Sequence, residues 1–424
     1  MAPPLNVFGQ TRMTLSDAIR LSQEHSYGVK SARSDSLSAI FDLGAARASR
    51  FPTLSLSAMG SHINKLQTIS LPFVGTQTLG VKDRYQADLK LSLPLYTGGR
   101  ISNQIKIQRE IANGKSYSLE SERLDNAYLT RKAYMGYMAA QAVTASAAAS
   151  LSRLKLIQVD VQNLYNAGMA DSVDILESEI ALEKAQQSLD QQITQEQNAG
   201  SVLSRLVGFG PGDSLVAADS IPIPDYEMYK DLKPTIEEIN RPELQALNSR
   251  VRAAGLVVKL NTSNFFPMLS GVGGYSYGKP NLDQFNNTWN DYWTAGLNLS
   301  WDFNIGGKTI YNVRSANETA NSLKMTKSDL EESLLLGAQT ALQNLNYSYN
   351  SYTTSQRQFD LSQLEFHLAK NQERAGKIST NRLLELEANL TATEQMYRVS
   401  MINYYISETE YLYATGSTKI FGGF

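Results

Sequence analysis

The stretch "LSLPLYTGGR" (residues 91–100) is followed, 208 positions further along the chain, by "LSWDFNIGGK" (residues 299–308). Each copy reads as a strand that ends in two glycines and a basic residue. None of the twelve prolines lies between residues 95 and 210 or between residues 281 and 424, so a long helix can follow each copy. An order of elements that occurs twice indicates that the chain consists of two related halves.

Two further pairs of segments support this duplication. "FPTLSLSAMGSH" (residues 51–62) matches "FPMLSGVGGYSY" (residues 266–277), and "NAGMADSVDILESEIAL" (residues 166–182) matches "RAGKISTNRLLELEANL" (residues 374–390). We expect a first repeat over residues 1–208, with strands at about 51–63 and 85–97 and then a helical hairpin. An irregular linker over 209–240 precedes a second repeat over 241–416, with strands at about 266–278 and 292–305, and residues 417–424 form a tail.

The expected strands alternate between apolar and polar residues. The apolar positions are Tyr85, Ala87, Leu89, Leu91, Leu93 and Leu95 in the first half and Trp293, Ala295, Leu297, Leu299, Trp301, Phe303 and Ile305 in the second. The positions between them include Asp88, Lys90 and Asp302. A period of two predicts strands with one apolar and one polar face, typical either of a half-buried sheet in a soluble protein or of a membrane barrel.

The aromatic residues favour the barrel. All three tryptophans, Trp289, Trp293 and Trp301, lie in one short window that also contains Tyr292. Amphipathic aromatic rings gather at membrane interfaces, whereas tryptophans of a soluble core would be scattered. We therefore predict that these four residues lie at a membrane interface.

The proline-free segments predict two helical hairpins. Long helices are expected over about 101–166 and 309–375, and return helices over about 171–207 and 380–414. A glycine precedes each return helix, where it can end the preceding helix in a left-handed cap. The fold class is therefore mostly α with β: long antiparallel coiled-coil hairpins plus four strands per chain.

The composition argues against several classes of function. With 39 basic and 41 acidic residues the net charge is -2, which does not favour nucleic-acid binding. The chain has no cysteine, and its three histidines, His25, His62 and His367, are isolated in sequence. Thiol chemistry is therefore excluded, and no histidine-based metal site or catalytic triad is indicated. We expect no enzyme activity, cofactor or metal site. No apolar run reaches the ~18 residues of a membrane-spanning helix.

The duplicated strand ends "LPLYTGGR" and "FNIGGK", the strand starts "FPTL" and "FPML", and the matched hairpin tips together resemble the TolC-type outer membrane factor family. This resemblance implies a homotrimer in the outer membrane of a Gram-negative bacterium. Four strands from each chain would close a twelve-stranded barrel in the lipid, and the helices would continue it as a periplasmic tunnel. The implied function is the exit duct of a tripartite efflux pump, with a periplasmic adaptor protein and an inner membrane transporter as partners.

Two other functions stay open from the sequence. The first is the exit duct of a type I protein secretion system, which the same resemblance allows. The second, from another class, is a soluble coiled-coil scaffold or stalk protein, which would explain the helices but not the apolar face of the strands.

The resemblance also implies roles for the hairpin tips, as a gate and as the contact with the adaptor. The gate residues are Asp174, Glu177, Arg382 and Glu385. Arg382 stands where the family often has an acid, so the gate is either an acidic ring or a set of salt bridges between Asp174 and Arg382. Alternatively, the acids of the first helical turns only stabilise the helix ends. The expected adaptor contacts are Gly168, Met169, Ala170, Gly376, Lys377 and Ile378.

The repeated glycine pairs are predicted to have a structural role at the ends of the strands. We expect Gly98, Gly99, Gly306 and Gly307 to allow a sharp turn from each strand into the following helix, because small residues permit such turns.

Overall fold

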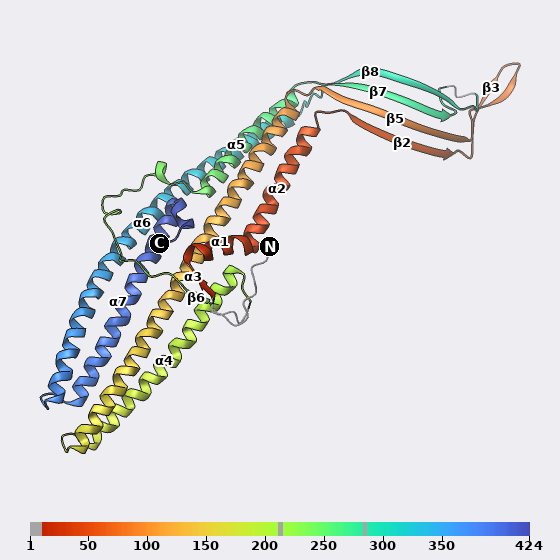
Figure 1. Ribbon diagram of the computed structural model, residues 1–424. Helices are drawn as coiled ribbons and strands as arrows, with labels where there is room; N and C mark the ends of the chain where they lie inside the picture. The colour runs from red at the N-terminus through yellow and green to blue at the C-terminus, as the bar shows by residue number, and fades with distance from the viewer. Residues whose placement is uncertain (1–10, 211–214, 283–285) are drawn as a thin grey trace. The chain divides into compact units, whose positions relative to one another are not determined.

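The computed structural model describes residues 11–210, 215–282 and 286–424 (Figure 1). The chain divides into two compact units, and each unit takes segments from both repeats. The first unit contains the chain up to Ser34, Tyr117–Gln245 and Ser328–Phe424, and the second contains Asp35–Ser116 and Ala246–Lys327. The boundaries of these units therefore differ from the boundaries of the repeats.

Four long helices dominate the chain: α3 (Arg100–Asn166), α4 (Ser172–Val207), α6 (Lys308–Arg374) and α7 (Thr380–Thr415). Their ends confirm the expected helices to within one residue. The helix α3 ends at a glycine with positive φ, Gly168, and the N–H of Met169 donates to the carbonyl oxygen of Leu164 (2.8 Å). Gly376 and Lys377 end α6 in the same way. These Schellman turns reverse the chain, so α3–α4 and α6–α7 form two hairpins whose tips lie at the same end of the first unit (Figure 1).

The hairpins share two apolar cores within the first unit. The larger core gathers α1 (Leu15–His25) with α3, α4, α6 and α7 around Tyr134, Met135 and Tyr404. The smaller core lies towards the tips and contains Ile157 and Val161 of α3, Phe366 of α6 and Leu383 of α7. The short strands β1 (Thr11–Met13) and β6 (Leu215–Ala217) pair in parallel.

The segment expected as an irregular linker and the expected tail are more ordered than predicted. Residues 211–214 lie outside the described residues, but the linker contributes β6 and the 3₁₀ helix η1 (Ile236–Glu238). The tail expectation was wrong, because η3 (Thr418–Phe421) packs Ile420 completely into the larger core. Arg131, itself buried, donates to the carbonyl oxygen of Gly422 (2.8 Å) and so holds the end of the chain.

The second unit contains a four-stranded antiparallel sheet with the order β2-β5-β7-β8. Its strands are β2 (Thr53–His62), β5 (Asp83–Tyr96), β7 (Met268–Lys279) and β8 (Asn290–Ser300). Pairing of β5 with β7 joins the two repeats. The strand β8 ends at Ser300 rather than near residue 305, because its last partner in β7 is Met268 and the preceding Pro267 has no N–H to donate.

A two-stranded hairpin between β2 and β5 was not predicted. It consists of β3 (Gln67–Leu71) and β4 (Gly75–Leu79). Among the strands of the described residues, these two pair only with each other. The remaining helices are α2 (Tyr27–Ala48), α5 (Pro242–Thr262) and the short η2 (Ser263–Phe265). Among the described helices, none has a stretch sufficiently long and apolar to cross a membrane.

Candidate functional site: the two-faced sheet and the hairpin tips

Most large apolar residues of the four strands lie on one face of the sheet, with Met59, Met268 and Val272 as exceptions on the other face. The register places Leu56 opposite Leu89, which is opposite Tyr275, which is opposite Trp293. Residues directly opposite one another in a sheet point to the same face. This face is not covered within the chain: Leu56 is 76%, Trp293 75% and Leu297 71% exposed. The protein therefore presents a continuous apolar surface that must be covered by something else.

The other face is polar. Ser57 lies opposite Asp88, which lies opposite Ser276, and the side-chain amide of Gln86 donates to Asp88 (2.8 Å). Tyr292 lies opposite Ser276 and therefore belongs to this polar face. Its position in the two-residue period turns Tyr292 away from Trp293, and its place at a membrane interface stays a prediction.

Aromatic clusters mark both ends of the apolar face. At one end the ring of Trp289 stacks on Tyr277 (centroids 5.1 Å apart) and on Tyr85 (6.3 Å). At the other end Trp301 contacts Phe303 (4.7 Å). The clusters at Trp289 and Trp301 are twelve positions apart, which corresponds to about 40 Å of fully extended chain. Because strands of membrane barrels are tilted by about 35–45°, this length spans about 30 Å of height, comparable with the ~25 Å apolar band between the aromatic girdles.

The glycine turns differ between the repeats. Gly98, Gly99 and Gly307 have positive φ, whereas Gly306 does not. A Cβ on Gly98 would lie 2.6 Å from Cβ of Phe266 and 2.9 Å from the carbonyl oxygen of Ser263, so no side chain fits there. A Cβ on Gly306 would meet no atom within 4 Å. Three of the four glycines thus have the conformation that the turn hypothesis needs.

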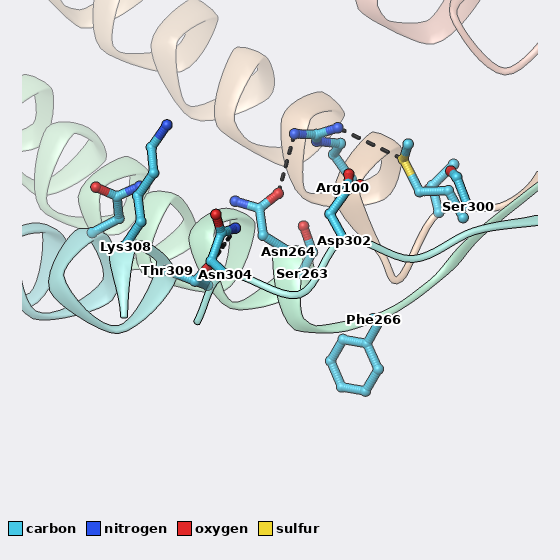
Figure 2. Close-up of a pocket in the computed structure, with 12 residues that line it drawn as sticks. Arg100, Ser263, Asn264, Phe266, Ser300, Asp302, Asn304, Lys308 and Thr309 are labelled. Carbon is cyan, nitrogen blue, oxygen red and sulfur yellow. Dashed lines mark hydrogen bonds between the residues drawn. The ribbon is translucent and has the colours of Figure 1, made fainter. Parts of the chain in front are cut away.

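A cavity of about 280 Å³ lies where the strands meet the long helices (Figure 2). The basic residues that end the two repeated stretches, Arg100 and Lys308, both line it. Arg100 donates to the side-chain oxygen of Asn264 (3.1 Å), and Asp302 adds an opposite charge. The lining is mostly polar, and no single charge dominates it.

At the first hairpin tip, Asp174 serves the helix end. The side chain of Asp171 accepts hydrogen bonds from the N–H groups of Val173 and Asp174, and the Asp174 carboxylate accepts from the N–H of Asp171 (3.1 Å). This capping box satisfies donors that the first turn would otherwise leave unpaired. Within the described chain neither Asp174 nor Glu177 forms an ion pair with Arg382.

At the second tip, Arg382 is occupied by acids of its own hairpin. Its guanidinium lies 2.6 Å from Glu385 and 3.6 Å from Glu365, and Ser379 caps the helix by accepting from the N–H of Arg382. All three charged side chains are about half exposed, so these pairs contribute little stability and can exchange partners. The choice between an acidic ring and salt bridges from one chain to another stays a prediction.

The six residues expected to contact an adaptor form the two tip turns. Gly168, Met169, Gly376 and Lys377 are exposed, whereas Ala170 and Ile378 are partly buried. Ile378 packs against the smaller core, so it anchors its turn in addition to any contact with a partner.

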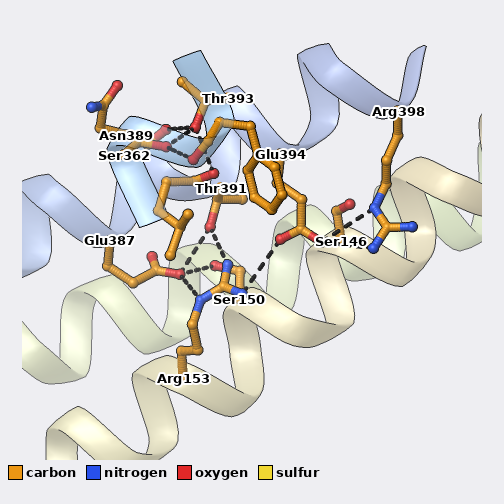
Figure 3. A network of polar contacts seen from close by, with 12 residues as sticks. Ser146, Ser150, Arg153, Ser362, Glu387, Asn389, Thr391, Thr393, Glu394 and Arg398 are labelled. Atoms are coloured by element: carbon orange, nitrogen blue, oxygen red, sulfur yellow. Dashed lines mark hydrogen bonds and ion pairs between the residues drawn. The ribbon is translucent and has the colours of Figure 1, made fainter. Parts of the chain in front are cut away.

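A polar network above the tips was not predicted from the sequence (Figure 3). Arg153 of α3 donates to Glu387 (3.0 Å) and Thr391 (2.8 Å) and lies 3.4 Å from Glu394, all on α7. The side chains of Glu387 and Glu394 are only 3% and 9% exposed. Glu394 also pairs with Arg398 (3.0 Å). The network therefore joins the two hairpins inside their packed surface.

A sequence signal for this network does exist. Glu387 and Glu394 are seven residues apart and hence on one helix face, which also carries the buried Leu386 and Leu390. Acids within an apolar stripe predict a buried partner, because an unpaired buried charge is strongly unfavourable. A second missed residue, Glu373, is buried at the tip of α6.

The described residues contain no group of three or more acidic or histidine side chains placed to hold a metal ion. Together, the chain has a sheet with one uncovered apolar face, one polar face, and two helical hairpins with polar tips. These features are typical of a membrane protein whose sheet has an apolar outer surface.

The family model described as outer membrane efflux protein matches residues 19–208 and 236–400, most of the chain. The chain therefore belongs to the outer membrane efflux protein family, and it is an outer membrane protein of the efflux channel class. This family is not a class of enzymes. The soluble scaffold hypothesis is set aside, because it does not agree with this membership.

Solved structures have the same fold. The outer-membrane channel OprN is 18% identical, with a TM-score of 0.76 over 96% of this chain and 90% of that one. VceC from Vibrio cholerae is 15% identical, with a TM-score of 0.79 over 95% of this chain and 96% of that one. The CmeC channel from Campylobacter jejuni is 16% identical, with a TM-score of 0.76 over 95% and 85%. No curated protein sequence matches the chain.

Proposed function

We propose that three copies of this chain form an outer membrane duct through which solutes leave the cell. Their sheets would close into one twelve-stranded barrel, and their helical hairpins would form a tunnel in the periplasm. The duct would be the last part of a tripartite efflux pump, joined at the hairpin tips to a periplasmic adaptor and supplied by an inner membrane transporter. OprN and CmeC, which have this fold, are described as outer membrane channels.

The observation that carries this proposal is the uncovered apolar face of the sheet. It extends over all four strands and ends in aromatic clusters, as a lipid-facing barrel wall does. The outer strands β2 and β8 each have one unpaired edge in the described sheet. Open edges are not tolerated in lipid, and four strands are too few to close a barrel, so closure requires further copies.

The polar face supports transport rather than anchoring alone. Asp88, Lys90 and Ser276 would line the inside of a closed barrel, where water and polar solutes pass. These side chains carry both signs of charge, so we expect a conduit with weak ion selectivity.

Light scattering on the purified chain, with and without detergent, tests the proposal. We expect a particle that needs detergent and contains protein of three times 46.9 kDa. It should also conduct ions across a planar lipid bilayer. A monodisperse monomer or dimer that is stable without detergent would overturn the barrel.

A further inference from the structure

Glu373 is a buried carboxylate without a partner. It lies at the end of α6, beside the tip turn, and is 2% exposed. Neither of its carboxylate oxygens has a hydrogen-bond partner within the described chain. An ionised carboxylate in such a place is much less stable than a protonated one, because burial removes water from the charge and nothing replaces it.

The groups around Glu373 add to this effect. Asp160 faces it from α3 and Asp174 from α4, while Arg374 and Lys370 belong to α6 itself. From α7, the apolar Leu383 belongs to the adjacent core. Burial and then the charge of Asp160 raise the pKa of Glu373, and the two basic residues oppose this only in part. The guanidinium of Arg374 also forms an ion pair with Asp160 (3.0 Å), so its charge stabilises an ionised Glu373 less.

We propose that Glu373 is a proton-controlled latch between the two hairpins. It holds a proton while α6 packs on α3 and α4 as in this structure, and release of that proton to water loosens the tips. The packed arrangement is then fully stable at low pH. Its stability falls as the pH rises from the ordinary glutamate pKa of about 4.5 through the raised value in the packed state.

A loosened tip would open the tunnel entrance as the pH rises. This last step rests on the function proposed above, whereas the protonation of Glu373 and the loosening of the helices do not.

The absence of cysteine makes the latch testable by thiol labelling. Ala369 lies one turn before Glu373 and is 4% exposed, so an Ala369→Cys thiol reacts only when the packing loosens. Asp360, exposed on the same helix, provides the reference as Asp360→Cys. The ratio of the two labelling rates, measured in the purified detergent-solubilised protein, removes the common effect of pH on thiol reactivity.

We expect this ratio to rise as the pH increases above the ordinary glutamate pKa of about 4.5, by at most about tenfold per pH unit, until the raised pKa of the packed state is passed. With Glu373→Gln, which cannot lose a proton, the ratio should stay low and flat. With Asp160→Asn the rise should end at lower pH and be smaller, because one charge that raises the pKa of Glu373 in the packed state is gone while its pKa in the loosened state is unchanged. At a pH where ordinary carboxylates are already ionised but Glu373 is not, infrared spectra should show a carboxylic acid C=O band that Glu373→Gln lacks.

A ratio that does not change with pH in the otherwise unaltered protein would overturn the latch. So would the same pH-dependent rise in the Glu373→Gln protein. If that variant does not fold, a rise in Asp160→Asn that is as large as in the otherwise unaltered protein and ends at the same pH overturns it instead. A labelling response without any pH-dependent change in bilayer conductance would support the latch and overturn its link to opening of the duct. Absence of channels altogether would instead count against the proposed function.

Discussion

At the scale of single residues, Gly98 and Gly306 occupy equivalent places in the two repeats, but only Gly98 lies where a larger residue would not fit. Gly98 has φ of 59° and touches Phe266, whereas Gly306 has neither a positive φ nor a close neighbour. We expect Gly98→Ala to lower the free energy of unfolding by about 1–3 kcal/mol, from backbone strain and the clash. Gly306→Ala should change it by less than about 0.5 kcal/mol.

Thermal unfolding of the two variants in detergent checks this difference. Equal melting temperatures would contradict it. The sequence pointed to both glycines because the stretch repeats, but the φ angle and the contact with Phe266 depend on how η2 and β7 pack against the turn. The glycine pair could therefore be found from sequence, and its unequal roles could not.

At the scale of secondary-structure elements, Arg153 connects α3 to α7. Replacing it with alanine leaves Glu387 buried without its cation, while Glu394 keeps Arg398. We expect Arg153→Ala to lower the free energy of unfolding by about 2–3 kcal/mol. This is somewhat less than the 3–5 kcal/mol typical of a fully buried broken pair, because the Arg153 side chain is 22% exposed. The measurement is chemical unfolding of the purified protein in detergent.

A second substitution separates charge from packing. Adding Glu387→Gln to Arg153→Ala removes the unpaired charge, so it should restore part of the loss. If the double variant is less stable than Arg153→Ala, the explanation by an unpaired charge is wrong. The exposed pair Arg382 and Glu385 is a suitable comparison, since Arg382→Ala should leave the stability nearly unchanged.

The elements themselves could largely be predicted from the sequence. Proline-free segments and the glycines at 168 and 376 located the four long helices, because proline is excluded from helix interiors and glycine ends them. The hairpin β3–β4 was missed, since its short strands carry no strong alternation. The partners of Arg153 and the charged neighbours of Glu373 were also missed, because they come from helices of different repeats and depend on the angle at which those helices pack.

At the scale of the whole molecule, the two faces of the sheet require different kinds of side chain at neighbouring positions of β8. Leu297 lies on the apolar face and Asn298 on the polar face, and both are exposed in the single chain. In a soluble chain, lysine at either exposed position would have a small effect. In a barrel, Leu297→Lys places a charge in lipid, which costs about 2–4 kcal/mol near the bilayer midplane, whereas Asn298→Lys faces water.

We therefore expect Leu297→Lys to reduce the yield of assembled particles in the outer membrane fraction, while Asn298→Lys assembles normally. Sedimentation of membrane fractions and native gel electrophoresis in detergent measure this yield, and the chain without substitutions provides the reference. Because the two positions are adjacent on one strand, differences in expression or local strand propensity are nearly matched. Equal yields from the two variants would mean that the apolar face does not meet lipid. There would then be no physical reason to expect that sheets from several chains close into one barrel.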